Sequence, residues 1–363
     1  QMGDDAFRKA MQSFYRTNRG RKASFADARA ELEAASGLNL ERFFADWVTR
    51  TGAADLDVAD ILITVADQGY TVSGRLLQRQ SEGPFEITVP LVVTTANGPV
   101  VDSVRMVTGE SRFNIATDSL PLMLSVDPAF DVFRLLDVRE TAPSIGQIFG
   151  DSAITAVLPA DAEKSTRDAY EAIVRSWESP AQSVTVVLDK DVTSLPADRS
   201  VWLFGASNRV APKVFENDRV ARVSATDSTI TLGRETLDFA GHSTVAITRH
   251  PENVAKAVGW IAADPVPAFE GLARKLPHYG KYSYLAFEGE EPANIVKGEW
   301  AATDSPLLVD LRPITGRQEP ITPAVLPDRA PLAELPALFS GERMMADVEW
   351  LAAPEREGRG VGT

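Results

Sequence analysis

Histidine is the residue whose number and spacing say most about the chemistry open to this chain. The sequence contains three histidines, His242, His250 and His278. A His-Glu-x-x-His zinc helix needs two histidines four residues apart, and no pair here has that spacing. Cysteine is absent, which excludes disulfides, thiolate nucleophiles and cysteine-ligated zinc. The sequence therefore predicts no catalytic residue, no cofactor site and no metal site in this chain.

Residues 205–208 form a polar turn at a position where ligands often bind. The turn follows a predicted strand, and loops after strands carry the ligand sites of α/β folds. It lacks the further glycines of a dinucleotide loop and the Gly-Lys-Ser/Thr of a phosphate loop. Ser207 and Asn208 are candidate contact residues, although a turn that caps the next helix is the favoured interpretation.

Residues 277–284 hold the densest polar and aromatic cluster of the chain. Within it, His278, Tyr279 and Lys281 are candidate contacts for a ligand or a partner. The favoured alternative is a strand edge whose tyrosines pack with their hydroxyls in water. A serine hydrolase stays open as a third possibility, because serine and aspartate are abundant, yet the sequence has no Gly-x-Ser-x-Gly elbow.

Three aspartates, Asp127, Asp131 and Asp137, lie close together in the sequence. A calcium loop needs tighter spacing and a glycine hinge. These aspartates are therefore predicted to cap turns and to lie in solvent.

The first secondary-structure elements predicted along the chain are helices. Apolar residues recur at helical spacing over residues 4–50, most clearly around Phe43 and Trp47. Ser24, with an aspartate three residues on, predicts a variant capping box, and Gly37 predicts the end of that helix. The aromatic side chains of the stripe are predicted to pack in a core.

Strands follow the helices. Alternating apolar residues mark several short strands over residues 56–127, and the Asn-Gly pair at 97–98 is typical of a hairpin turn. Strands without helices between them favour a β-sandwich. Residues 150–290 alternate strands with helices, which predicts an α/β layer with a largely parallel sheet. Pro251 is expected to begin a helix there.

The predicted fold class is a multi-domain α+β protein. It consists of an N-terminal helical segment, an antiparallel β-sandwich and an α/β layered domain with a mostly parallel sheet. The expected ranges are 1–53 for the helical segment, 54–136 for the sandwich, 137–311 for the α/β domain, 312–336 for a Pro-rich linker, and 337–363 for the start of a following domain.

The charge of the chain excludes several classes of partner. With 37 basic and 51 acidic residues, the net charge is −14, whereas nucleic acids and anionic membranes require a positive surface. No apolar run approaches the ~20 residues that span a bilayer. We therefore expect a soluble protein with no nucleic-acid partner and no membrane span. The oligomeric state is not predicted.

The first 140 residues or so carry a set of positions that is shared with a known family. These are Ala6, Phe7, Phe14, Tyr15, the stretch 23–27, residues 35–37, the stretch 43–48, Arg50, Gly52, Gln78, residues 89–91, Asp127, Pro128 and the stretch 131–134. Together they resemble the post-catalytic part of aminopeptidase N-like zinc metallopeptidases. In that family a helical tail follows the zinc helix and leads into a β-sandwich. The zinc ligands and the glutamate base lie upstream, so none can be assigned to this chain.

The last residues resemble a second family. Met345, the stretch 348–352, Pro354, Glu355 and the stretch 357–363 are similar to the entry into two-zinc peptidases of the bacterial leucyl aminopeptidase type. In that family the metal ligands come later in the chain.

The two resemblances together imply a piece of a longer fusion protein. They predict a non-catalytic structural or docking segment whose partners are the flanking peptidase modules of the same polypeptide. They also predict that zinc binds only in those modules. The compartment is not predicted, and a periplasmic or secreted parent protein is compatible with the sequence. The alternative is a module that binds a small ligand or a partner through the α/β domain.

Overall fold

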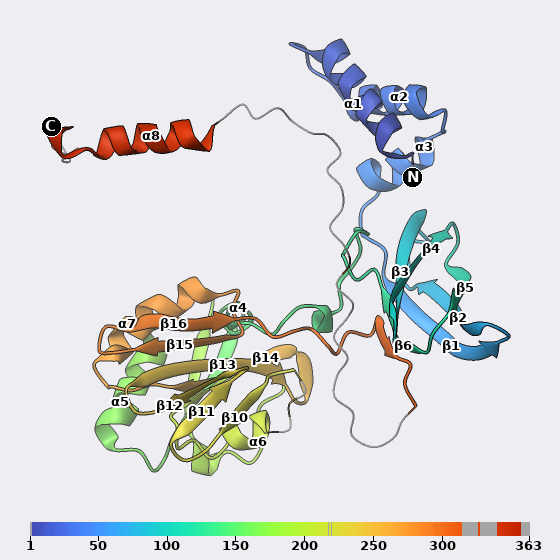
Figure 1. Ribbon diagram of the computed structural model, residues 1–363. Helices are drawn as coiled ribbons and strands as arrows, with labels where there is room; N and C mark the ends of the chain where they lie inside the picture. Colours follow the sequence, from blue (N-terminus) through green and yellow to red (C-terminus); the bar gives the residue numbers. More distant parts are fainter. Residues whose placement is uncertain (1, 217, 219, 314–325, 327–339, 357–363) are drawn as a thin grey trace. The chain divides into compact units, whose positions relative to one another are not determined.

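The computed structural model describes residues 2–216, 218, 220–313, 326 and 340–356. The chain divides into two units: residues 52–324 form one, and the two ends of the chain form the other. Figure 1 shows the succession of elements along the chain. The expected Pro-rich linker and the final residues 357–363 fall largely outside the described residues.

The N-terminal end is helical, as predicted. It contains α1 (Asp4–Asn18), α2 (Phe25–Ser36) and α3 (Glu41–Phe44), and α3 continues into a π-helical turn, η1 (Ala45–Thr49). The Ser24 side chain accepts a hydrogen bond from the Asp27 amide in a capping box, and Gly37 ends α2 in the left-handed conformation, which confirms both predicted caps.

The apolar stripe of residues 40–48 is only partly buried in the described residues, where Leu40 is 8% exposed and Phe44 and Trp47 are half-buried. Phe43 is 39% exposed and Val48 is 43% exposed, whereas the prediction placed this stripe in a core. The physical reason is size, because three short helices enclose too little volume to cover their apolar side chains. Near the other end of the chain lie α8 (Gly341–Ala352) and the 3-10 turn η5 (Pro354–Arg356), and the apolar residues of α8 are also exposed.

Two antiparallel sheets follow the helical segment. One has the order β1-β2-β5, from β1 (Leu56–Ala66), β2 (Gly69–Gln78) and β5 (Glu110–Thr117). The other has the order β17-β6-β3-β4, from β3 (Ile87–Thr95), β4 (Gly98–Met106), β6 (Pro121–Val126) and β17 (Leu308–Asp310). The Asn-Gly hairpin is confirmed, because Thr95 pairs with Gly98 across a two-residue turn.

Strand β17 comes from the far end of the α/β region. Leu308 pairs with Ser125 and Asp310 pairs with Met123, so the chain returns to the sandwich after the α/β layer is complete. The range expected for the α/β domain, 137–311, therefore contains a strand of the sandwich. The α/β layer is connected to the sandwich at both of its ends.

The α/β layer contains one seven-stranded sheet of order β16-β15-β13-β14-β9-β7-β8. Its strands are β7 (Ala153–Leu158), β8 (Ser183–Leu188), β9 (Ser200–Phe204), β13 (His242–His250), β14 (Asn253–Ala262), β15 (Tyr284–Glu288) and β16 (Ala293–Gly298). Strands β14, β9, β7 and β8 run parallel to one another, and β13, β15 and β16 join them in antiparallel pairs.

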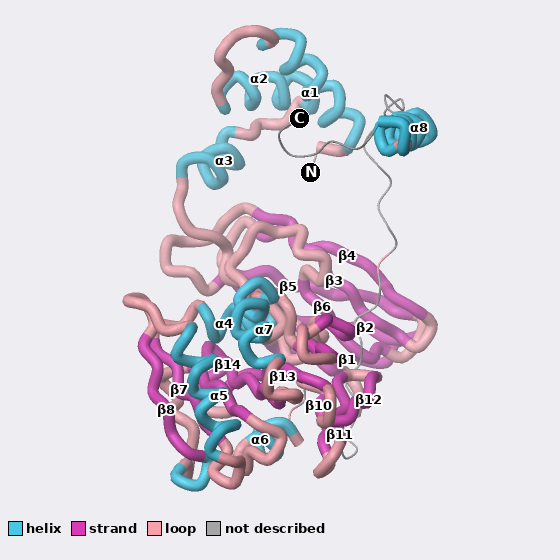
Figure 2. The backbone as a smooth tube through the Cα atoms, turned by 90° about the vertical axis from the view of Figure 1, so that its left-hand side faces the viewer, coloured by secondary structure: helices cyan, strands magenta, loops and turns pink. Residues whose placement is uncertain are grey.

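The short elements of the layer complete its two faces. They are η2 (Val138–Glu140), α4 (Ile145–Phe149), α5 (Lys164–Ser176), η3 (Asp189–Asp191), α6 (Ala211–Phe215), α7 (Ala268–Lys275) and η4 (Leu276–Tyr279), with a small sheet of β10 (Val223–Ala225), β11 (Thr229–Leu232) and β12 (Glu235–Asp238). Figure 2 shows α5 beside β7 and β8.

Successive residues of β9 point to opposite faces of the sheet and enter two separate cores. Trp202 packs with residues of α4, α5 and α7, whereas Leu203 packs with residues of α6 and of the small sheet. This alternation gives the sheet a helix-covered face and a second face covered by α6 and β10–β12.

The helix expected at Pro251 is a turn. Strands β13 and β14 form an antiparallel hairpin, with Ala246 opposite Trp260 and a bulge at Arg249 and His250. The fixed φ of proline suits the first turn of a helix and a tight turn equally well. The pairing of β13 with β14 from Thr244 to His250 decides between them here.

Candidate functional site

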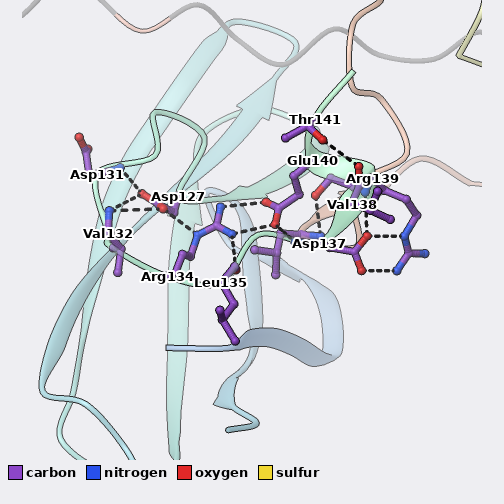
Figure 3. Close-up of polar contacts among 12 residues, drawn as sticks. Asp127, Asp131, Val132, Arg134, Leu135, Asp137, Val138, Arg139, Glu140 and Thr141 are labelled. Carbon is purple, nitrogen blue, oxygen red and sulfur yellow. Dashed lines mark hydrogen bonds and ion pairs between the residues drawn. The ribbon is translucent and has the colours of Figure 1, made fainter. Parts of the chain in front are cut away.

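A buried arginine links the end of the sandwich to the start of the α/β layer. Arg134 donates from Nε to Asp127 Oδ2 at 2.9 Å, and from Nη1 and Nη2 to the two carboxylate oxygens of Glu140, each at 2.8 Å (Figure 3). The exposed fractions of the three side chains are 1% for Arg134, 0% for Asp127 and 6% for Glu140. Two carboxylates thus share one guanidinium out of contact with water.

Backbone groups complete the shell of this triad. Asp127 Oδ1 accepts the amide of Asp131 at 2.8 Å, and Glu140 Oε2 accepts the amide of Asp137 at 2.9 Å. Asp127 itself has a φ of 48°, a backbone conformation that aspartate tolerates better than most residues. The connecting segment, residues 127–140, is thus held by hydrogen bonds and ion pairs among its own residues.

A second arginine holds the same segment from within the α/β sheet. Arg249, in β13, donates to the carbonyl of Val138 at 3.0 Å and to the carbonyl of Thr141 at 2.8 Å. Its Nε also donates to Asp304 at 3.0 Å, in the segment that returns to the sandwich. The amide of Leu135 donates to the carbonyl of Ala54 at 2.8 Å. We call Asp127, Arg134, Glu140, Arg249 and Asp304 the ionic junction.

Burial and charge act in opposite directions on the pKa values of the junction. Burial raises the pKa of Asp127 above its ordinary value, and the hydrogen bond from Arg134 only partly offsets this. For Arg134, burial opposes the charged form, but the hydrogen bonds to Glu140 and Asp127 outweigh it and raise the pKa. The guanidinium of Arg139 lowers the pKa of the half-buried Asp137 to about 2.

Sequence reasoning missed this junction. Asp127 was expected to cap a turn in solvent; it does bind turn amides, but its side chain is fully buried. Asp137 caps η2, as expected of a turn aspartate. The spacing of Asp127, Arg134 and Glu140 was visible in the sequence, but charges in a connecting segment are most often solvated, so spacing alone gave no signal of burial.

The candidate residues of the 205–208 turn have different surroundings. Asn208 is buried and donates from its side-chain amide to the carbonyls of Val157 and Phe204, each at 3.0 Å. Its Oδ1 accepts the amides of Val210 and Ala211 at the start of α6. Ser207 is exposed and lines a cavity. Asn208 thus caps a helix, and Ser207 alone faces solvent.

The second group of candidates lies on and after η4. His278 and Lys281 are exposed, and the Lys281 ammonium lies 5.0 Å from the ring centre of Tyr282. Tyr279 is half-buried and packs edge-on against Phe287. The cavity lined by Ser207 is not lined by His278, Tyr279 or Lys281.

The cavity beside Ser207 lies where parallel strands end. Its volume is about 270 Å³, and it is bordered by Pro159 after β7, Gly205 after β9 and Asp264 after β14. The carboxyl ends of parallel strands are the usual ligand position in α/β sheets. Most of its other lining residues are small or apolar, so it offers few polar groups to a ligand.

In the described part of the chain, no histidine has the hydrogen-bond partners typical of a catalytic histidine. His242 Nδ1 contacts the backbone carbonyl of Asp238, and His250 Nδ1 accepts the amide of Glu252. Within the described ranges, no histidine is hydrogen-bonded to a serine hydroxyl or a carboxylate, and no group of three or more metal-binding side chains is placed to hold an ion. Nor is any described helix long and apolar enough to cross a bilayer.

Comparison with solved structures gives several likenesses, among them an aminopeptidase and a flavohemoglobin. Aminopeptidase A of Legionella pneumophila, whose structure was determined with aspartic acid, is similar over 38% of this chain at 14% identity and a TM-score of 0.29. This chain covers 17% of that protein. The flavohemoglobin of Malassezia yamatoensis is similar over 56% of this chain and 68% of its own, at 9% identity and a TM-score of 0.17. No protein-family model matches the sequence, and the comparison with curated proteins finds no match.

Proposed function

We propose that this chain is a non-catalytic structural segment of a larger zinc aminopeptidase-like protein. Its task is to hold the α/β layer on the sandwich, so that flanking peptidase modules of the same polypeptide are attached to a stiff spacer. The observation that carries the structural role is the ionic junction. The link to aminopeptidases comes from the sequence resemblances at the two ends of the chain.

The junction supports this role because it ties both connections of the α/β layer together. The ion pair of Arg134 with Glu140 stiffens the segment that leads from the sandwich into the α/β layer. Arg249 binds the carbonyl of Val138 in that segment and also Asp304, in the segment that leads back to the sandwich. Strand β17 then fixes the returning chain to β6. A buried polar network favours a single arrangement of its segments when each polar group has a hydrogen-bond partner. A shift of either segment would then leave buried charges unpaired.

In this proposal, zinc is bound only by modules outside the chain, and the parent protein works in the periplasm or outside the cell. The test measures zinc content and the hydrolysis of aminoacyl anilides, for the 363-residue chain and for a polypeptide extended at both ends. We expect the chain to be metal-free and inert and the extended protein to bind zinc and cleave. Stoichiometric zinc or turnover in the chain itself would overturn the proposal.

The cavity beside Ser207 favours a second candidate function, the binding of a small ligand. Its position at the carboxyl ends of three strands supports this reading, although about 270 Å³ is slightly below the usual range for ligand pockets. Thermal-shift measurements with free amino acids and dipeptides test it, with Ala206→Trp as the variant that fills the cavity. A stabilisation that Ala206→Trp abolishes supports ligand binding, and no shift with any of them counts against it.

A further inference from the structure

Strand β16 leaves one edge of the seven-stranded sheet open. It pairs with β15 on one side, and it ends the strand order of the sheet in the described residues (Figure 1). A cavity of about 910 Å³ borders this strand. Four consecutive residues of β16, 294–297, line it. Since successive side chains alternate between faces, a consecutive run means that the strand edge itself borders the cavity.

The turn between β11 and β12 lines the same cavity. Residues 232–235 line the cavity consecutively. An aromatic platform also lines the cavity, in which Tyr284 stacks on Trp300 with ring centres 4.2 Å apart. The buried indole N–H of Trp300 donates to the carbonyl of Ile247 at 2.8 Å, which holds the platform in place. The Tyr284–Trp300 platform is thus a fixed aromatic surface in the cavity that borders the unpaired edge of β16.

The charges at this cavity differ from those of the whole chain. Arg222, Arg234 and Lys297 line it together with Glu235 and Glu299, three cations against two carboxylates, whereas the chain carries a net charge of −14. Among the described residues, no ion pair engages any of the three cations. Lys297 has its ammonium 5.7 Å from the ring centre of Tyr282. Their donors are therefore open to an anionic group.

We propose that an extended peptide with acidic side chains binds here by adding a strand to the free edge of β16. The open edge offers backbone donors and acceptors, which a peptide backbone matches. The cations Arg222, Arg234 and Lys297 then pair with carboxylates of the peptide, and the Tyr284–Trp300 platform contacts its apolar side chains. This inference is independent of the scaffold role and of the flanking modules.

The test is fluorescence anisotropy with a labelled short peptide of alternating glutamate and valine. We expect saturable binding that weakens with added salt. The double variant Arg222→Glu/Arg234→Glu should weaken it on the order of tenfold or more. Arg274→Glu is the matched control and should leave binding unchanged, because α7 covers the opposite face of the sheet.

A pair of N-methylated peptides tests the strand pairing separately from charge. Methylation of alternate amides blocks hydrogen bonds along one edge of the peptide only. We expect one of the two methylation registers to lose binding and the other to keep it. No binding, equal binding of both methylated peptides, or indifference to the Arg222/Arg234 reversal would each overturn the proposal.

Discussion

Replacing Arg134 with methionine tests whether the charges of the junction depend on one another. The variant removes three charge-assisted hydrogen bonds of 2.8–2.9 Å and leaves the carboxylates of Asp127 and Glu140 buried without a counter-charge. Breaking a buried ion pair from one side typically costs about 3–5 kcal/mol. Three backbone donors remain, the amides of Asp131 and Val132 on Asp127 and the amide of Asp137 on Glu140, and they keep our expected loss of unfolding free energy within that range.

Urea denaturation followed by far-UV circular dichroism measures the loss, and Arg139→Met is the matched control. Arg139 pairs with Asp137 in the same segment, but its side chain is 38% exposed, so its removal should cost less than about 1 kcal/mol. The double variant Arg134→Met/Glu140→Gln also removes the unpaired charge of Glu140, so it should recover part of the lost free energy of unfolding.

The pH dependence gives a second readout of the same variant. Without Arg134, burial raises the folded-state pKa of Asp127 further above its unfolded value, because the opposing hydrogen bond is gone. The folded state then binds more protons, so the deficit relative to the parent protein should shrink as the pH falls from 7 toward about 5. Equal losses for Arg134→Met and Arg139→Met, or a deficit that does not change with pH, would refute the reasoning.

Three further substitutions probe single side chains. Burial lowers the pKa of His250 below its ordinary value, so stability should fall as the pH drops through about 6.5, and His250→Gln should reduce that loss in urea titrations at pH 7 and 5. Asn208→Ala breaks four buried hydrogen bonds and should cost about 2–3 kcal/mol in denaturant melts, whereas the neighbouring Ser207→Ala should stay within about 0.5 kcal/mol. Since the pKa of Asp137 is lowered to about 2, its stabilisation is lost as the pH falls from 3.8 to that value, and Asp137→Asn should flatten this limb of an acid-unfolding curve; an unchanged limb would contradict it.

Local signals in the sequence were accurate where the structure depends on near neighbours. The Ser24 capping box, the Gly37 cap and the Asn-Gly hairpin involve residues a few positions apart, and each is present. The turn chosen at Pro251 shows the limit of such signals. There a proline compatible with two local structures became a hairpin turn because β13 pairs with β14 from Thr244 to His250.

For the candidate site, the sequence supplied residue types but not their surroundings. It named Ser207 and Asn208 together, yet the fold buries Asn208 as a helix cap and leaves Ser207 beside a cavity. It also placed the aspartates near residue 127 in solvent, whereas Asp127 is enclosed by Arg134 and two backbone amides. Burial of a charge depends on what packs around it, and that comes from distant segments.

By itself the sequence determined the succession of helices, paired strands and an α/β layer, because hydrophobic period, caps and turns act over a few residues. The absence of cysteine likewise excludes disulfides and cysteine-ligated metal sites within these 363 residues. Only the tertiary structure decided that residues 308–310 return to pair with β6, and that Arg249 in β13 meets Val138 and Asp304. These contacts join segments more than fifty residues apart, and their stability comes from burial and satisfied hydrogen bonds that no local pattern encodes.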